Sequence, residues 1–228
     1  MTTVEPAPGA TCDGDVPLRR GSAYSYRCRA CNKCCRDKII PVSPYEIFLL
    51  ARHLDLDTTA VIARHTEAGG TVLQVEADNV CVFLGERGCA VHPARPLACR
   101  IYPLGAHIDA DGDETFSRLE PHPATAGVYG RDGTVADYLA AQGVAPFMDA
   151  HARYAELHAR MMEILLAADD AEAQAYDEAR AALPVSESGR AASDWLDIDK
   201  MLGAAARNVV PETVVTRHIA AIEADLTP

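Results

Sequence analysis

The clearest apolar stripe with helical spacing lies between residues 44 and 54, at Ile47, Leu50, Ala51 and Leu54. Ser43 precedes this stripe and is a good N-cap residue. Pro44 suits the first turn of a helix, because the N–H that proline lacks would have no intrahelical partner there. The pattern therefore predicts a helix over residues 44–54.

Shorter patterns follow between residues 57 and 119. We expect a second helix to begin after Asp57 and to end at Gly69-Gly70, and the sequence TVLQV that comes next predicts a short strand. Cysteine and proline are so frequent between residues 81 and 103 that this segment should be rich in loops. Residues 105–119 carry an apolar-polar run on each side of Asp111-Gly112-Asp113, which is typical of a hairpin.

The second half of the chain is predicted to be helical. A helix should begin near Thr134 and break before Pro146, and another should run on to about Ala168. The latter has a stripe that we interpret as ordinary core packing, formed by Phe147, His151, Tyr154, His158, Met161 and Leu165. Alanine-rich segments at 169–183, 192–206 and 211–225 continue the helical pattern.

Charge separates the two halves of the 228-residue chain. Residues 1–107 contain 12 basic and 11 acidic residues, whereas residues 108–228 contain 9 and 22, so most of the formal charge of -12 lies in the second half. We predict a flexible arm at 1–20, a cysteine-cluster domain at 21–133 and an acidic helical region at 134–228. The expected fold class is α+β and mainly helical: a loop-heavy metal-binding domain with a small hairpin, packed by the acidic helices.

The compartment determines how the cysteines are interpreted. The first 20 residues have no apolar run like that of a secretory signal, and no stretch approaches the 18 apolar residues of a membrane helix. We therefore expect a cytoplasmic protein without membrane contact. Cytosolic thiols stay reduced, so the cysteines are expected to bind metal or take part in redox chemistry instead of forming disulfides.

Seven of the eight cysteines fall into two groups. The first is a C-x2-C-x2-C-C run formed by Cys28, Cys31, Cys34 and Cys35, and the second contains Cys81, Cys89 and Cys99. A C-x2-C turn aims two thiolates at one point, and a tetrahedral metal or an iron-sulfur cluster needs four ligands, which explains a second group. The alternative is that these are merely small buried apolar residues. Cys12, in the arm, is interpreted as a free thiol.

The number of ligands leaves the metal open. Seven cysteines and one histidine would serve two zinc ions, whereas one 4Fe-4S cluster would use four ligands and leave the others for a second metal or for structure. The candidate histidines are His92 and His122, with His107 less favoured. Adjacent side chains tend to diverge, so Cys34 and Cys35 are not expected to share one mononuclear metal ion.

A family resemblance rests on two blocks, CCRDKIIPVSPYEI and CVFLGERGCAVHPARPLACRIYPL, together with the cysteines before them. Over roughly residues 26–135 the chain resembles the YkgJ-like cysteine-cluster family, described as a zinc- or iron-chelating domain with a CxxCxxCC signature. The cysteine block is also similar to that of flagellin lysine N-methylases, which implies an iron-sulfur cluster. The second block includes Arg95, Arg100 and Tyr102. Family members commonly have a further Cys-Pro where this chain has His122-Pro123.

Three functions remain open at this stage. The first is an iron-sulfur, iron or zinc protein acting in redox or metal-dependent modification or maturation chemistry. The second is a structural zinc module that serves protein-protein interaction, and the third is a metal carrier or sensor. Motifs of nucleotide hydrolases, dinucleotide oxidoreductases, zinc proteases and serine hydrolases are absent from the sequence, so whether the chain is an enzyme stays open.

The partner is undefined by sequence, whether protein or small molecule. Residues 19–38 contain seven basic residues and one acid, Asp37. This basic segment either offsets the negative charge of thiolates or docks an anionic partner or substrate.

Overall fold

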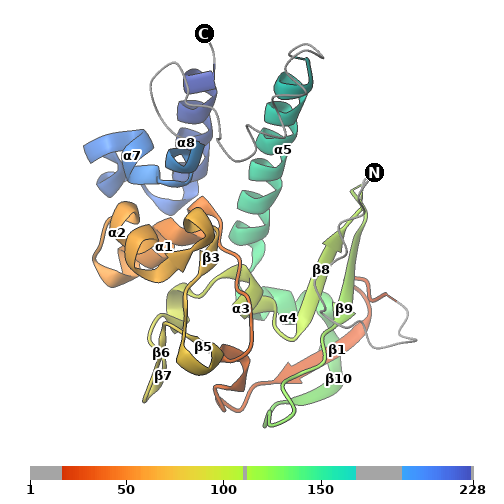
Figure 1. The fold of residues 1–228 in the computed structure, drawn as a ribbon. Coiled ribbons are helices and arrows are strands. Elements are labelled where there is room, and N and C mark those ends of the chain that lie inside the picture. The colour runs from red at the N-terminus through yellow and green to blue at the C-terminus, as the bar shows by residue number, and fades with distance from the viewer. Residues whose placement is uncertain (1–16, 110–111, 168–191, 227–228) are drawn as a thin grey trace. The chain divides into compact units, whose positions relative to one another are not determined.

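The computed structural model describes residues 17–109, 112–167 and 192–226 (Figure 1). The described residues form two compact units, and each unit collects several segments of the chain. Unit 1 takes its residues from 1–38, 75–90 and 96–145, and unit 2 from 39–74, 91–95 and 146–228. Seven α-helices and small antiparallel strand pairs make up the described part, so the fold is mixed α+β as predicted. These units interleave along the chain. The predicted division at residues 20 and 133 stays a prediction.

Unit 1 is built around strand β1 (Ala23–Arg27), which pairs antiparallel with β10 (Val128–Thr134). Tyr24 is 1% exposed, and its ring packs edge-on against Tyr138 and Tyr129. Helix α4 (Val135–Gln142) follows β10 directly, with Thr134 as its N-cap in a capping box. The predicted start of a helix near Thr134 is therefore confirmed.

The predicted hairpin is also confirmed. Strand β8 (Leu104–Ile108) pairs with β9 (Glu114–Arg118), and Phe116 on β9 is fully buried. Residues 110–111 of the turn lie outside the described residues. Leu18 exchanges two backbone hydrogen bonds of 2.8 Å with Phe116, and the Arg20 guanidinium binds the Glu114 carboxylate. Leu18 and Arg20, which belong to the predicted arm, are thus held in unit 1, whereas residues 1–16 of the arm lie outside the described residues.

Very short elements fill the rest of unit 1. Strand β4 (Val75–Glu76) pairs with β5 (Val80–Cys81), and β6 (Leu84–Gly85) pairs with β7 (Gly88–Cys89). Helix α3 (Leu97–Ile101) has five residues, and a 3-10 turn spans Lys33–Cys35. The single strand predicted for TVLQV is divided, because Val72–Leu73 form β3 in unit 2 and β4 starts two residues later.

Unit 2 begins with α1 (Pro44–Leu54), whose predicted bounds are confirmed. Helix α2 (Thr58–His65) is capped by Asp57 but ends at His65, so the predicted end at Gly69-Gly70 is wrong. Thr66–Glu67 form β2, which pairs with β3. Gly69 and Gly70 both have positive φ in the turn between these strands, so the glycines make a reversal of the chain instead of a helix end.

The remaining elements of unit 2 are α5 (Ala145–Ala167), α7 (Ile198–Leu202) and α8 (Pro211–Leu226). The predictions for α5 and for 211–225 are confirmed, whereas residues 169–183 lie outside the described residues. The helix predicted over 192–206 is wrong in length. It divides into two 3-10 segments around α7, because Asp197 caps a new helix and Gly203, at φ 62°, ends it.

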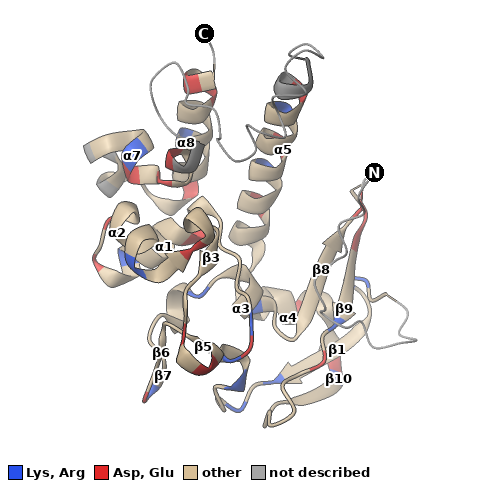
Figure 2. Ribbon diagram, viewed as in Figure 1, with Lys and Arg blue, Asp and Glu red and all other residues tan. Residues whose placement is uncertain are grey.

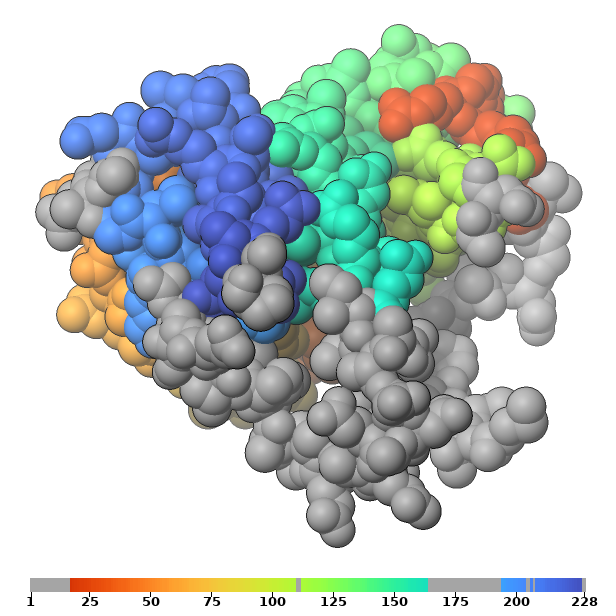
Figure 3. All heavy atoms as spheres, turned by 90° about the horizontal axis from the view of Figure 1, so that it is seen from above, coloured from red at the N-terminus to blue at the C-terminus, as the bar shows by residue number. Residues whose placement is uncertain are grey.

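Polar side chains of α5 and α8 contact each other in unit 2. Arg153 donates a hydrogen bond to the Thr216 hydroxyl, Arg160 pairs with Glu223, and the surfaces of the two helices adjoin in the space-filling view (Figure 3). The predicted α5 core stripe is only partly correct. Phe147 is buried, whereas His158 is exposed and the His151 side chain is 44% exposed.

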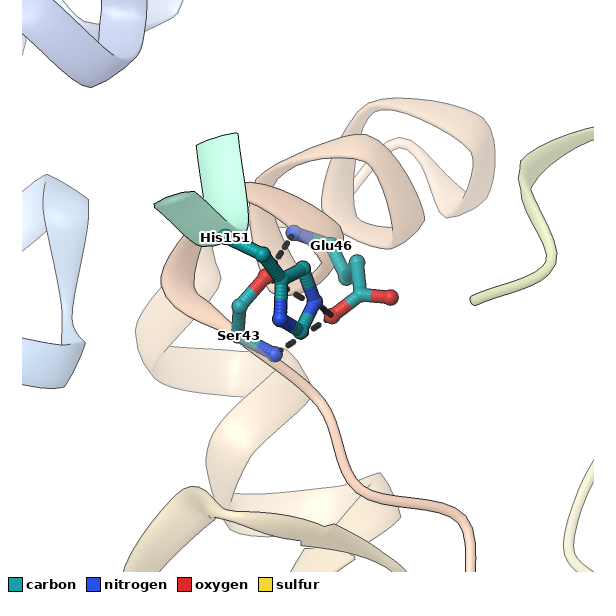
Figure 4. A network of polar contacts seen from close by, with 3 residues as sticks. All are labelled: Ser43, Glu46 and His151. Carbon is teal, nitrogen blue, oxygen red and sulfur yellow. Dashed lines mark hydrogen bonds and ion pairs between the residues drawn. The ribbon is translucent and has the colours of Figure 1, made fainter. Parts of the chain in front are cut away.

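His151 takes part in a polar network instead (Figure 4). Its Nε2 lies 3.3 Å from Oε2 of Glu46, a carboxylate that is 1% exposed. The same oxygen accepts hydrogen bonds from the Ser43 backbone N–H at 2.6 Å and the Ser43 hydroxyl at 2.7 Å. The buried carboxylate is therefore satisfied by its own capping box and by α5.

No helix within the described ranges is long and apolar enough to cross a membrane.

Candidate metal centre

The first cysteine run follows β1 in a sharply turning segment. Ala30 and Asn32 have φ of 51° and 59°, and the 3-10 turn then carries Cys34 and Cys35. The exposed Cys28 accepts a hydrogen bond from the Ala30 N–H at its sulfur. Alternating left-handed residues let the chain reverse within a few positions, so that the C-x2-C-x2-C-C run stays compact.

Backbone contacts bring the second cysteine group beside this turn. Arg36 forms an isolated β-bridge with Val80, the residue before Cys81, and the Asp37 N–H donates to the Asn79 carbonyl at 2.9 Å. Cys81 ends β5 and Cys89 ends β7, while Cys99 lies in α3. All seven cysteines belong to unit 1, and the structure contains no disulfide among them.

Electrostatic interactions define a group of four thiols, formed by Cys34, Cys35, Cys81 and Cys89. A hydrogen bond with the Cys34 thiol, burial and the charges of the other three thiols raise the pKa of Cys35. Burial is the largest cause that raises the pKa of Cys81, and the charge of Cys34 adds to it. Ionised sulfurs in this group would repel one another, and a bound cation would remove that repulsion.

Comparison with known families finds one match, which includes all seven of these cysteines. Residues 27–121 match the CxxCxxCC family model, which is described as "Putative zinc- or iron-chelating domain". This segment is similar to the CxxCxxCC domain, and the name is used below for residues 27–121 in that sense. No curated protein and no solved structure matches the chain.

A second part of the CxxCxxCC domain surrounds Cys31, which belongs to the first run but has partners of its own. The Ala126 N–H donates to the Cys31 sulfur at 3.4 Å, and the Thr125 hydroxyl lies 3.7 Å from it. The backbone N–H groups of Ala126 and Lys33 lower the pKa of Cys31. These N–H groups favour a thiolate at this position, which is the form that binds metal.

The loop that supplies these donors is held by a close approach. A Cβ at Gly127 would lie 1.8 Å from the Tyr26 hydroxyl oxygen, so a larger residue at this position would have to displace the Tyr26 side chain. The Tyr26 hydroxyl also lies 3.4 Å from Oγ1 of Thr125. Sequence reasoning missed Thr125 and Ala126, because a backbone N–H donor leaves no signal in residue type.

The predicted histidines lie in three different settings. His122 accepts the Ala124 N–H at Nδ1, and its Nε2 lies 3.9 Å from Oδ2 of Asp37. His107 is on the hairpin, with Nε2 2.8 Å from the Ser117 hydroxyl. His92 belongs to unit 2. His122 thus contacts Asp37, in the segment that directly follows Cys35.

Tyr102, Arg100 and Arg95, the other residues of the second sequence block, also form polar contacts. The Tyr102 hydroxyl accepts the His122 N–H at 3.2 Å, and Lys38 lies over its ring at 5.9 Å. Arg100 donates to the Gln142 carbonyl. Arg95 belongs to unit 2, where it donates to the His92 carbonyl.

Over the described ranges, no three His, Cys, Asp or Glu side chains stand at distances that would hold a metal ion without movement. The four thiols interact with one another, yet metal binding would have to draw them closer. The strand pairs that carry Cys81 and Cys89 have two residues per strand.

Proposed function

We propose that the CxxCxxCC domain holds an iron-sulfur cluster and acts in redox or metal-dependent modification or maturation chemistry. The observation that carries this proposal is the mutual interaction of four thiols in Cys34, Cys35, Cys81 and Cys89. Soft thiolates select zinc and iron-sulfur clusters over hard cations. The family description supports the same two metals.

The adjacent cysteines favour a cluster over a single ion. Cys34 and Cys35 are neighbours in a 3-10 turn and interact through their thiols. Two adjacent ligands strain a mononuclear tetrahedral site, whereas a cluster has several iron atoms on which they can end. Cys28, Cys31 and Cys99 then remain for the same cluster or for a second metal site.

The surroundings of Cys31 support a metal centre whose reduction potential is adjusted by the protein. Hydrogen bonds from N–H groups to a ligating sulfur, together with exposure to solvent, set the potential of an iron-sulfur cluster. The N–H of Ala126 would supply such a bond if Cys31 is a ligand.

Anaerobic purification followed by elemental analysis and a visible spectrum on one sample tests the proposal. We expect iron with acid-labile sulfide and a broad band at roughly 400 nm. About two zinc ions per chain and no visible absorption, as expected of a d10 ion, would contradict it.

Cysteine variants test the ligand assignment. Cys35→Ser and Cys89→Ser should lose metal and stability together, because metal binding in a loop-rich domain is coupled to folding. A loss of several kcal/mol would lower the Tm by about 10 °C in a chain of this size. Cys12→Ser is the matched control and should keep both. Full metal content in both test variants would refute the four-thiol group as ligands.

A structural zinc module is the second candidate, and one observation favours it. The strand pairs that carry Cys81 and Cys89 have two residues per strand, which is too little pairing to be stable without another constraint. Zinc could supply that constraint. The elemental analysis described above separates the two candidates.

A further inference from the structure

A cavity of about 420 Å³ lies in unit 1 beside Cys31. Its lining comes from the segments that carry the cysteines, with Cys31, Lys33 and Arg36 from the first run and Val80, Leu84 and Glu86 from the second. The cavity therefore lies between the two cysteine-bearing segments and next to the proposed metal.

Two cations in this lining, Lys33 and Arg36, have no carboxylate of a described residue within ion-pair distance. Within the described residues, neither Lys33 nor Arg36 forms an ion pair, although Arg20 in the same basic segment is paired with Glu114. Figure 2 shows Lys and Arg recurring along the segment that follows β1. Glu86 is the one carboxylate in the lining, and Cys31 adds a second negative charge when it is a thiolate.

The chemistry of the lining defines the ligand class. A guanidinium binds carboxylate or phosphate oxygens in a bidentate way, and an ammonium adds a point charge. Val80 and Leu84 supply apolar surface for a carbon skeleton. We propose that this cavity binds a small organic anion, carrying a carboxylate or a phosphate, between Lys33 and Arg36 as the substrate of the adjacent metal centre.

The substrate role rests on the proposed metal function, whereas anion binding itself does not. A metal bound by four thiolates is itself negatively charged, so an anion could approach it only where cations offset the repulsion. Lys33 and Arg36 line the cavity through which the anion would approach, so their positive charges would offset this repulsion. If they serve only to balance the thiolates, the cavity has no ligand.

Calorimetric titration of the full chain at low ionic strength tests the proposal, with succinate and glycerol 3-phosphate as probes. The stronger binder identifies the oxyanion. Lys33→Gln and Arg36→Gln should each weaken binding by about tenfold or more, as expected for loss of a charge-assisted hydrogen bond. Arg131→Gln makes the same chemical change at an exposed position of β10 outside the cavity, and should leave binding unchanged.

Metal content measured on the same samples keeps the two proposals separate. Binding that depends on Lys33 and Arg36 supports the anion cavity, even in protein without metal, in which case the metal function fails alone. Absence of binding by both probes to metal-loaded protein overturns the anion cavity and leaves the metal function standing. Loss of metal in the Lys33 and Arg36 variants, with no anion binding by the parent protein, also overturns it and assigns these residues to charge balance.

Discussion

Acidification should weaken unit 2 through one buried histidine. His218 on α8 is fully buried, and its Nδ1 lies 2.9 Å from the Tyr154 hydroxyl of α5. Burial lowers the pKa of His218 to about 4, although the Trp195 backbone and the Asp197 charge act in the opposite direction. The native state therefore resists a proton that the unfolded chain accepts at its ordinary pKa of 6.5.

The size of the effect follows from these two pKa values. Between pH 6.5 and pH 4 the unfolded state binds more protons than the native state, so stability falls as the pH falls. A difference of about 2.5 pKa units corresponds to about 3 kcal/mol. The whole contribution is present above pH 6.5 and is lost once the pH reaches the pKa of the folded state.

Urea unfolding followed by tryptophan fluorescence measures this loss. Trp195 is the only tryptophan of the chain, it lies in unit 2, and its indole N–H donates to Asp225. We expect His218→Gln, which cannot titrate, to lose about 3 kcal/mol less stability than the parent protein between pH 7.5 and pH 4. His158→Gln, at an exposed position of α5, is the matched control and should follow the parent profile. Parallel profiles for the parent protein and His218→Gln would refute the argument.

Two further predictions concern the remaining polar and close contacts. The hydrogen bond with Glu46 raises the pKa of His151 despite partial burial. The pair therefore stabilises the fold fully below pH 6.5, and this stabilisation is lost as the pH rises through the raised pKa. Glu46→Gln should lower the pKa of His151 in an NMR titration, and an unchanged pKa would contradict the assignment. Gly127→Ala should cost about 1–3 kcal/mol because its Cβ would overlap Tyr26, and should lower the Tm and metal content together. Gly21→Ala, where nothing lies within 4 Å, is the control, and equal melting of the two variants would show that the Tyr26 contact imposes no constraint.

Local signals in the sequence were sufficient wherever neighbouring residues form the structure. Ser43 and Pro44 predicted the start of α1, and Thr134 predicted the start of α4, because capping bonds join residues only three positions apart. The glycines after α2 were misinterpreted for the opposite reason. Their role depends on pairing between β2 and β3, which the local pattern does not contain.

The partners of His151 and His218 could not be predicted in the same way. His151 meets Glu46 across 105 positions, and His218 meets Tyr154 across 64, so neither contact leaves a periodic signal. A histidine in an apolar stripe gives the same sequence pattern whether it is a buried neutral ring or the partner of a carboxylate. Only packing of the helices distinguishes a half-exposed ion-pair partner from a buried neutral ring.

The sequence by itself determined the likeness of residues 27–121 to a zinc- or iron-chelating domain, because ligand type and the C-x2-C-x2-C-C spacing are present in neighbouring residues. Tertiary structure alone decided how these cysteines are grouped. Cys34 and Cys35 interact with Cys81 and Cys89, while Cys31 turns to the loop at Ala126. The physical reason is that thiols and N–H groups act over a few ångströms, and only folding brings segments some 50 to 95 positions apart within that range.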